Sequence, residues 1–260
     1  MPLKITREGP VVRVALDRPE VRNAFDADLI RELREAFESL GADDSVRAVA
    51  LSGEGKVFCA GADAEWMRAS LDLAPEENRE DARRMAAMFR AVDECPKIVV
   101  GLVHGAAMGG GAGLVACCDV VIAEEDAKFA FSEVKLGIVS AVISSFVLPK
   151  IGVSQARFLL LTGSTFDAAV AREIGLVHAV VPAGGREPSF GEVRDLLLRP
   201  GPRAVAEAKA LLRAVSRMGR DEAIDRCVET IARVRTSPEG QEGLRAFLEK
   251  RPPGWVSGAP

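Results

Sequence analysis

Short apolar segments alternate with amphipathic segments along most of the chain, and this alternation limits the possible folds more than any other feature. Residues 11–16, 46–52 and 97–103 are short apolar runs that predict buried strands. Between them, residues 29–40 and 75–93 carry apolar side chains at helical spacing. The elements predicted to continue the alternation are a strand at 119–123 and helices at 109–117, 154–161 and 167–174. Strands that alternate with helices in this way indicate an α/β fold with largely parallel strands.

The last quarter of the chain has a different texture. Residues 182–191 (PAGGREPSFG) predict a turn-rich linker, and the chain from there to Lys250 is helical in pattern. We therefore expect an α/β body over residues 1–190 and a helical region over residues 191–260. Residues 194–260 hold thirteen Lys and Arg against nine Asp and Glu, so the helical region is the basic part of the chain. A solvated helix surface explains this excess as well as contact with a phosphate-bearing ligand does.

Charge and cysteine content argue against several classes of protein. The whole chain carries a formal net charge of −4, which is the wrong sign for a protein that binds nucleic acid. Five cysteines without a CxxC pair, and only two histidines, argue against a disulfide framework and against a metal site. The amino terminus has no signal-peptide pattern and no run of about 18 apolar residues occurs, so we expect a cytoplasmic protein that does not enter a membrane.

The glycine-rich segment at residues 104–118 follows a predicted strand and opens a helix, where unpaired backbone N–H groups attract negative charge. Gly111, Gly113 and Ala116 match the G-x-G-x-x-A pattern of dinucleotide-binding turns. However, only about six residues separate Gly113 from the strand that begins near Val120, whereas a parallel crossover needs about a dozen or more. The spacing therefore disfavours a dinucleotide-binding fold.

An oxyanion hole explains the same glycines better. Glycines allow a substrate carbonyl to approach the backbone, and the N–H of Gly110 would then donate to the oxygen as negative charge develops on it. A second donor is available in residues 57–67, where a tight CAGAD turn precedes a short helix that Asp63 is placed to cap. The N–H of Ala62 would face the same cleft. The two segments together predict a site that stabilises an oxyanion.

Three motifs in order along the chain resemble the enoyl-CoA hydratase/isomerase family, also called the crotonase family. They are FCAGAD at 58–63, HGAAMGGGAGLVACCD at 104–119 and FSEVKLGIV at 131–139. The resemblance continues from DRPEVRNAF at 17–25 to EGLRAFLEKR at 242–251. It implies a spiral of ββα units followed by carboxyl-terminal helices that build a homotrimer, often paired into a hexamer. Within the family, the motifs are most similar to the branch that resembles methylglutaconyl-CoA hydratases.

The resemblance also implies an activity. Family members polarise the thioester carbonyl of an acyl-CoA with two backbone N–H groups, which correspond to Ala62 and Gly110. Of the two glutamates of typical hydratases, one corresponds to Glu133, whereas the other falls on Gly113. We expect a hydratase that adds water to a 2-enoyl-CoA, and Glu65 is a candidate replacement acid. A single glutamate also suits an isomerase that converts 3-enoyl-CoA to 2-enoyl-CoA, and a non-catalytic protein that binds CoA or RNA is a further alternative.

Contacts to the CoA substrate follow from the same resemblance. The pantetheine, adenine and phosphate groups of CoA would be contacted by three segments. These are the loop that holds Arg22 and Ala24, the CAGAD turn, and the carboxyl-terminal tail of a neighbouring subunit. The residues expected to bind substrate are Arg22, Ala24, Ala60, Ala62, Asp63, Ala64, Glu65, Gly110, Phe247 and Lys250. No separate cofactor is expected, because coenzyme A enters as part of the substrate.

Residues 140–143 depart from the family pattern, in which many members carry a proline and a glycine-rich turn. The β-branched Val142 and Ile143 are expected to narrow or reshape the acyl pocket. The Ser140 hydroxyl is expected to satisfy its own turn, with a hydrogen bond to water as the alternative. Trp66 and Met67 are candidates for the pocket lining, although a place in the core explains them equally well. Further side chains interpreted as structural or solvated are Cys59, His104, Asp119, Glu124, Glu125, Asp126 and His178.

Overall fold

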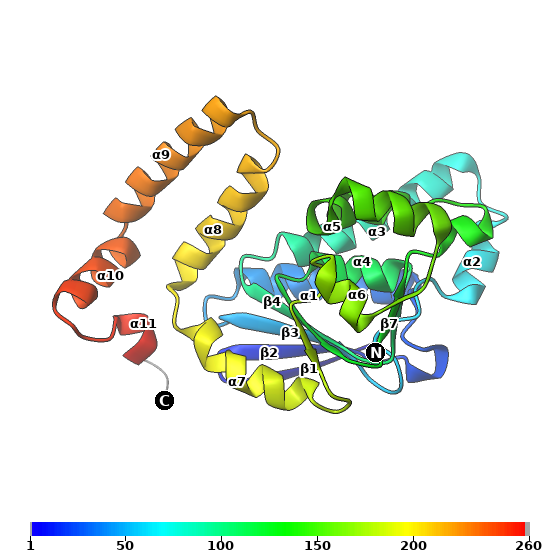
Figure 1. Cartoon of the computed structure of the whole chain (residues 1–260), viewed down its shortest axis with the longest axis horizontal. Coiled ribbons are helices and arrows are strands. Elements are labelled where there is room, and N and C mark those ends of the chain that lie inside the picture. Colours follow the sequence, from blue (N-terminus) through cyan, green and yellow to red (C-terminus); the bar gives the residue numbers. More distant parts are fainter. Residues whose placement is uncertain (1, 258–260) are drawn as a thin grey trace.

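The structure is a computed structural model that describes residues 2–257, and two β-sheets form its body (Figure 1). In this part of the chain, the larger sheet has six strands in the order β1 (Leu3–Glu8), β2 (Val11–Leu16), β3 (Ala48–Gly53), β4 (Ile98–Val103), β6 (Val120–Glu124) and β9 (Ala179–Val181). Its first pair is antiparallel, and every later pair is parallel. The smaller sheet contains β5 (Ala106–Met108), β7 (Lys128–Ala130) and β8 (Phe166–Asp167). The predicted α/β class with largely parallel strands is confirmed.

Helices cover both faces of the larger sheet (Figure 1). The helices of the body are η1 (Pro19–Val21), α1 (Ala27–Ala42), α2 (Ala64–Ser70), α3 (Pro75–Asp93), α4 (Gly110–Cys117), η2 (Glu133–Leu136), α5 (Ala141–Thr162), α6 (Ala168–Glu173) and α7 (Arg186–Leu198). Phe37 of α1 and Phe89 of α3 are fully buried in the main core. On the opposite face, Phe190 of α7 packs with Val11, Val100 and other residues of the sheet. The body is therefore a sheet between two helical layers.

Helix α7 occupies most of the segment that the sequence predicts to be a linker. Pro188 lies in the first turn of the helix, where the missing N–H costs no intrahelical hydrogen bond. Arg186 at its start pairs with Glu124 at 2.9 Å, and Glu124 is buried rather than part of a solvated turn. The prediction for Glu124 is therefore wrong, because the partner that makes its burial possible lies 62 residues away. The expected boundary between residues 190 and 191 falls inside this helix.

Two further differences from the sequence pattern concern β1 and α5. The sequence pattern missed strand β1, whose residues alternate poorly because most of its side chains are exposed at the edge of the sheet. The helix expected at 154–161 is the second half of α5, which bends at Gly152, where φ is 70°.

The remaining helices extend away from the sheet (Figure 1). They are α8 (Pro202–Val215), α9 (Arg220–Thr236), α10 (Pro238–Leu248) and α11 (Gly254–Ser257). Lys209 of α8 is tied to the body, because its Nζ donates to Asp119 Oδ2 at 2.6 Å and to the carbonyl of Lys97 at 2.9 Å. Large apolar side chains on these helices are exposed, among them Leu212, Ile231 and Phe247. Within the described residues, no helix is long and apolar enough to cross a membrane.

Candidate active site

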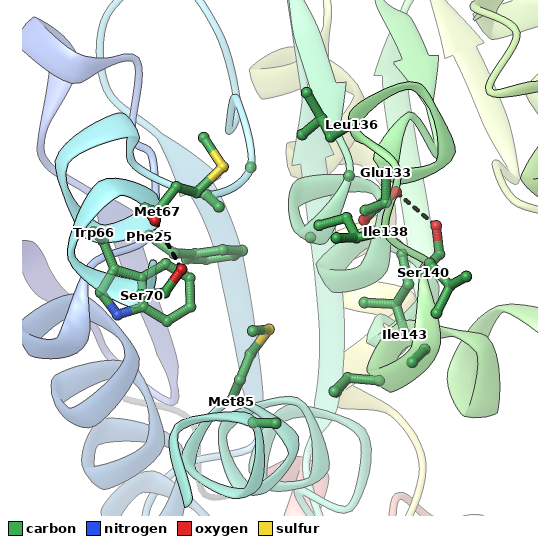
Figure 2. Close-up of a pocket in the computed structure, with 18 of the residues that line it drawn as sticks. Phe25, Trp66, Met67, Ser70, Met85, Glu133, Leu136, Ile138, Ser140 and Ile143 are labelled. Atoms are coloured by element: carbon green, nitrogen blue, oxygen red, sulfur yellow. Dashed lines mark hydrogen bonds between the residues drawn. The ribbon is translucent and has the colours of Figure 1, made fainter. Parts of the chain in front are cut away.

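A cavity of about 380 Å³ lies between the CAGAD turn with helices α2 and α3 on one side and the start of α4, η2 and α5 on the other (Figure 2). Most of its lining is apolar. The larger apolar side chains are Phe25, Trp66, Met67, Met85, Leu136, Ile138, Val139, Val142 and Ile143. The polar side chains in its wall are Ser70, Asn78, Asp81, Ser132, Glu133 and Ser140. A cavity of this composition suits an uncharged chain with one reactive polar group.

The CAGAD turn presents the amide of Ala62 to this cavity. Phe25 N donates to Gly61 O at 2.7 Å, and Asp63 N donates to Phe25 O at 2.9 Å. Since successive N–H groups of an extended segment point to opposite sides, the N–H of Ala62 points away from Phe25. Cys59 fixes the other edge of the turn by a pair of backbone hydrogen bonds to residues 106 and 108. The turn is therefore held on both sides. The Ala62 amide points to the side of the turn that faces the cavity, which Gly110 also lines.

Glycines bring the second amide close to the first. Gly110 is the first residue of α4, so its N–H has no partner within that helix. A Cβ built on Gly61 would lie 2.8 Å from Met108 O and 3.8 Å from Gly110 N, so only a glycine allows this approach. Gly109 has φ 50° and ψ −119°, a conformation that residues with side chains rarely adopt. Ala62 and Gly110 both line the cavity and together form a pair of donors suited to an oxyanion.

The Glu133 carboxylate lies directly over Gly109. A Cβ built on Gly109 would be 3.1 Å from Glu133 Oε1 and 3.9 Å from Oε2. The hydroxyl of Ser140 donates to Oε2 at 2.6 Å, as the dashed line in Figure 2 marks. The expectation that Ser140 satisfies its own turn is therefore wrong, because η2 brings Glu133 within reach of the buried hydroxyl. The carboxylate thus lies beside the residue that precedes Gly110, and it lines the same cavity as Ala62.

Ile143 occupies the space in front of Gly113. A Cβ built on Gly113 would be 2.4 Å from Ile143 Cγ2 and 3.2 Å from Phe89 Cε1. The position at which the family resemblance places a second glutamate therefore has no room for a longer side chain. Val142 and Ile143 both line the cavity, as the sequence predicts.

Several lining residues were not predicted from the sequence. Phe25, Met85 and Asp81 all face the cavity, and burial raises the pKa of the Asp81 carboxyl above its ordinary value. Asn78, Asp81, Ala82 and Met85 recur at spacings of three and four residues along α3, which is one face of the helix. That periodicity could have identified them. Trp66 and Met67, which were candidates, do line the cavity.

The other predicted residues near the CAGAD turn serve different purposes in the structure. Asp63 is buried, accepts a hydrogen bond from Glu65 N at 2.8 Å and thereby caps α2, and it pairs with Arg18 at 3.2 Å. Ala60 lines the cavity, whereas Glu65 is exposed and is not among the residues that line it. The replacement of the second acid by Glu65 therefore has no support in this geometry. Burial raises the pKa of the Cys59 thiol to about 12, so the thiol stays protonated.

Besides Asp63 and Glu65, five predicted contacts to CoA lie outside the cavity. Ala24 is buried beneath the turn, and the exposed Arg22 accepts a backbone hydrogen bond from Ala60 N at 3.0 Å. Phe247 and Lys250 belong to α10 and the residue pair after it, at the opposite end of the molecule from α2 (Figure 1). Phe247 is 80% exposed. Within one chain these two side chains do not approach the cavity, and their contact with substrate stays a prediction that requires a neighbouring subunit. Ala64, also predicted, is exposed at the start of α2.

Comparison with known proteins decides the family. A family profile described as enoyl-CoA hydratase/isomerase matches residues 6–258. The chain belongs to the enoyl-CoA hydratase/isomerase family. An enoyl-CoA hydratase from Shewanella pealeana, known from a crystal structure, shares 39% sequence identity with this chain. The two structures superpose with a TM-score of 0.94, over 98% of this chain and 96% of that one. The Pseudomonas aeruginosa protein AtuE is 36% identical with a TM-score of 0.94, over 98% of this chain and all of its own.

A relative with a named activity extends the comparison. The crotonyl-CoA hydratase of Syntrophomonas wolfei is 31% identical over 255 residues, which are 97% of each chain. These similarities confirm the crotonase fold and the expected membership of the family, and an acyl-CoA thioester fits that family as substrate. They do not distinguish the methylglutaconyl-CoA branch, which stays a prediction.

Proposed function

We propose that this protein is an enoyl-CoA hydratase that adds water across the double bond of a 2-enoyl-CoA thioester. The observation that carries the proposal is the position of the Glu133 carboxylate over Gly109, in the cavity that Ala62 and Gly110 also line. A thioester oxygen bound between the amides of these two residues would leave the first carbons of the acyl chain next to Glu133. The names of similar enzymes, including a crotonyl-CoA hydratase, support water addition as one reaction of this site.

One carboxylate can complete this reaction. Glu133 takes a proton from water as the water oxygen bonds to C3 of the acyl group, and the double-bond electrons move toward the thioester oxygen. The amides of Ala62 and Gly110 stabilise the resulting negative charge, a role for which one donor is typically worth about 3–4 kcal/mol of barrier. Glu133 then returns the proton to C2. The product is a 3-hydroxyacyl-CoA, and the carboxylate ends in its starting state.

Isomerisation is the second candidate, and the observation that favours it is the space filled by Ile143 in front of Gly113. With no second carboxylate at that position, a substrate whose double bond lies between C3 and C4 needs only Glu133. The carboxylate removes a proton from C2, the charge spreads through a dienolate to the thioester oxygen, and the proton returns to C4. Both reactions use the same amide pair, so only the products distinguish them.

The deciding experiment is incubation of the protein in deuterated water with crotonyl-CoA, 3-methylglutaconyl-CoA and a 3-enoyl-CoA, followed by mass spectrometry and proton NMR. Hydration gives a product heavier by one water, and Glu133→Gln abolishes it. The matched control is Glu65→Gln, because Glu65 is an exposed carboxylate near the site that is absent from the cavity lining. A product with a shifted double bond and no added water would overturn the proposed hydratase activity and support the isomerase. No change in any substrate would overturn both and leave the non-catalytic alternative.

A further inference from the structure

The Ser140 hydroxyl and the Glu133 carboxylate form a pair inside the cavity that neither proposed reaction by itself requires. We propose that Ser140 is a positioning residue that holds Oε2 of Glu133, so that Oε1 alone takes up and returns the proton. This inference rests on the function proposed above, because it assigns the orientation of the same carboxylate. Figure 2 shows the two side chains facing each other across the start of α5.

The contact between them is short and protected from bulk water. Ser140 Oγ donates to Glu133 Oε2 at 2.6 Å, within the range of hydrogen bonds from a hydroxyl to a carboxylate. Ser140 is only 4% exposed, although it contributes to the cavity wall. Its backbone is fixed because the carbonyl accepts from Ser144 N at 3.1 Å. Although Ser140 is the N-cap residue of α5, its hydroxyl is engaged by Glu133 and does not cap that helix.

The two carboxylate oxygens therefore have different surroundings. Oε1 is the oxygen closer to Gly109, at 3.1 Å from a Cβ built there, while Oε2 is 3.9 Å away and bonded to Ser140. Gly109 directly precedes the Gly110 amide, so Oε1 is turned toward the place where the thioester would bind. A free glutamate side chain has several rotatable bonds, and fixing it by packing alone leaves the carboxylate able to rotate. The hydroxyl removes that freedom.

Other partners that could orient the carboxylate are lacking. Among residues 2–257, no lysine, arginine or histidine lines the cavity, and Glu133 takes part in no ion pair within these residues. The other carboxylate in the lining, Asp81, belongs to α3 on the other side of the cavity and cannot donate when ionised. The serine hydroxyl is therefore the group that sets which oxygen faces the substrate.

The test compares Ser140→Ala and Ser140→Thr with Ser145→Ala, a matched control on the same helix whose exposed hydroxyl donates to the carbonyl of Val142. Losing one hydrogen bond to a charged group should lower kcat about 10- to 100-fold. KM should stay nearly unchanged, because the amides and the apolar wall still bind the substrate. Ser140→Thr, which keeps the hydroxyl, should recover most of kcat, and Ser145→Ala should match the wild type.

A double variant separates positioning from a merely structural role. If Ser140 acts only through the carboxylate of Glu133, Glu133→Asp/Ser140→Ala is no slower than Glu133→Asp alone, which keeps a carboxylate on a side chain too short to meet the hydroxyl, whereas a structural role would slow the double variant further. The positioning role is overturned if Ser140→Ala keeps the wild-type kcat while Glu133→Gln is inactive. It is also overturned if kcat and KM change together, or if Ser140→Thr folds with a normal melting temperature but does not recover. Full activity of Glu133→Gln would instead overturn the proposed function.

Discussion

The cavity wall formed by residues 60–62 and 109–110 presents backbone to the cavity, whereas the wall formed by residues 132–143 presents side chains. The first wall is fixed by hydrogen bonds to Phe25 and to β5, and its glycines leave no room for a Cβ at Gly61. The second wall depends on which side chains are present, namely Glu133, Ser140 and Ile143. In the proposed function, the first wall stabilises charge on the thioester, and the second determines which proton transfer follows.

The largest effect is expected from Gly61→Ala, which changes the backbone wall. The new Cβ would come within 2.8 Å of Met108 O and would force the CAGAD turn away from the start of α4. Loss of one oxyanion donor lowers kcat about 100- to 1000-fold, equivalent to about 2.7–4 kcal/mol of barrier. Steady-state kinetics with crotonyl-CoA would measure it.

The matched control for backbone strain is Gly184→Ala. Gly184 also has a positive φ, 77°, but a Cβ there meets nothing within 4 Å. We expect it to cost about 1–2 kcal/mol of unfolding free energy while kcat is unchanged. Equal losses of kcat in Gly61→Ala and Gly184→Ala would mean that backbone strain alone lowers activity, and would contradict a distinct role for the wall formed by residues 60–62 and 109–110.

An intermediate effect is expected where the side-chain wall meets α4. Gly113→Ala places a methyl group 2.4 Å from Ile143 Cγ2, and such overpacking costs about 1–3 kcal/mol of unfolding free energy. Ile143→Ala leaves a void and costs about 2–5 kcal/mol, toward the lower end because the side chain already borders a cavity.

The double variant Gly113→Ala/Ile143→Ala tests whether these two residues compete for one space. Its cost, measured by urea unfolding, should be smaller than the sum of the single costs by about 0.5–3 kcal/mol. Simple additivity of the two costs would mean that Ile143 does not fill the space in front of Gly113. It would contradict the conclusion that Ile143 leaves no room there for a second glutamate.

The smallest effect is expected on the pH dependence of the unfolding free energy, through the buried His104. His104 Nε2 lies 3.0 Å from Gly55 O, its Nδ1 is buried without a partner in the described residues, and burial lowers the pKa of its imidazole below 6.5. As pH falls below 6.5, His104 therefore takes up a proton more readily in the unfolded chain than in the folded protein. The stability that the neutral imidazole contributes is complete above pH 6.5 and is lost as pH falls toward the folded-state pKa.

The variant His104→Gln keeps a donor for Gly55 O but cannot be protonated. Its unfolding free energy should fall less steeply than that of the wild type between pH 7 and pH 5, with a difference of at most about 1.4 kcal/mol per pH unit. Urea unfolding at several pH values would measure this. The pKa of His178 is also lowered by burial, and because His178 is present in both proteins the difference isolates His104. Identical slopes would contradict the assignment.

The sequence alone predicted the fold class, because the alternation of strands and helices is a local pattern, and it predicted two segments that the structure brings to one cavity. Strand and helix periodicity is a property of neighbouring residues, and so are the tight turn before Asp63 and the helix start at Gly110. Glu133 was predicted differently, from the resemblance of residues 131–139 to the family motif. Helix α7 was missed because its burial depends on Phe190 meeting a distant sheet face.

Only the tertiary structure decided the chemistry around Glu133. Ile143 fills the space in front of Gly113 although the two residues are 30 positions apart in sequence, and Asp81 reaches the cavity from another helix. Ser140 lies only seven residues from Glu133, yet the contact requires η2 to end in the left-handed Gly137 before α5 begins. Periodicity determines which face of an element is apolar, whereas the packing of elements against one another determines which side chains meet and therefore which reaction the site can perform.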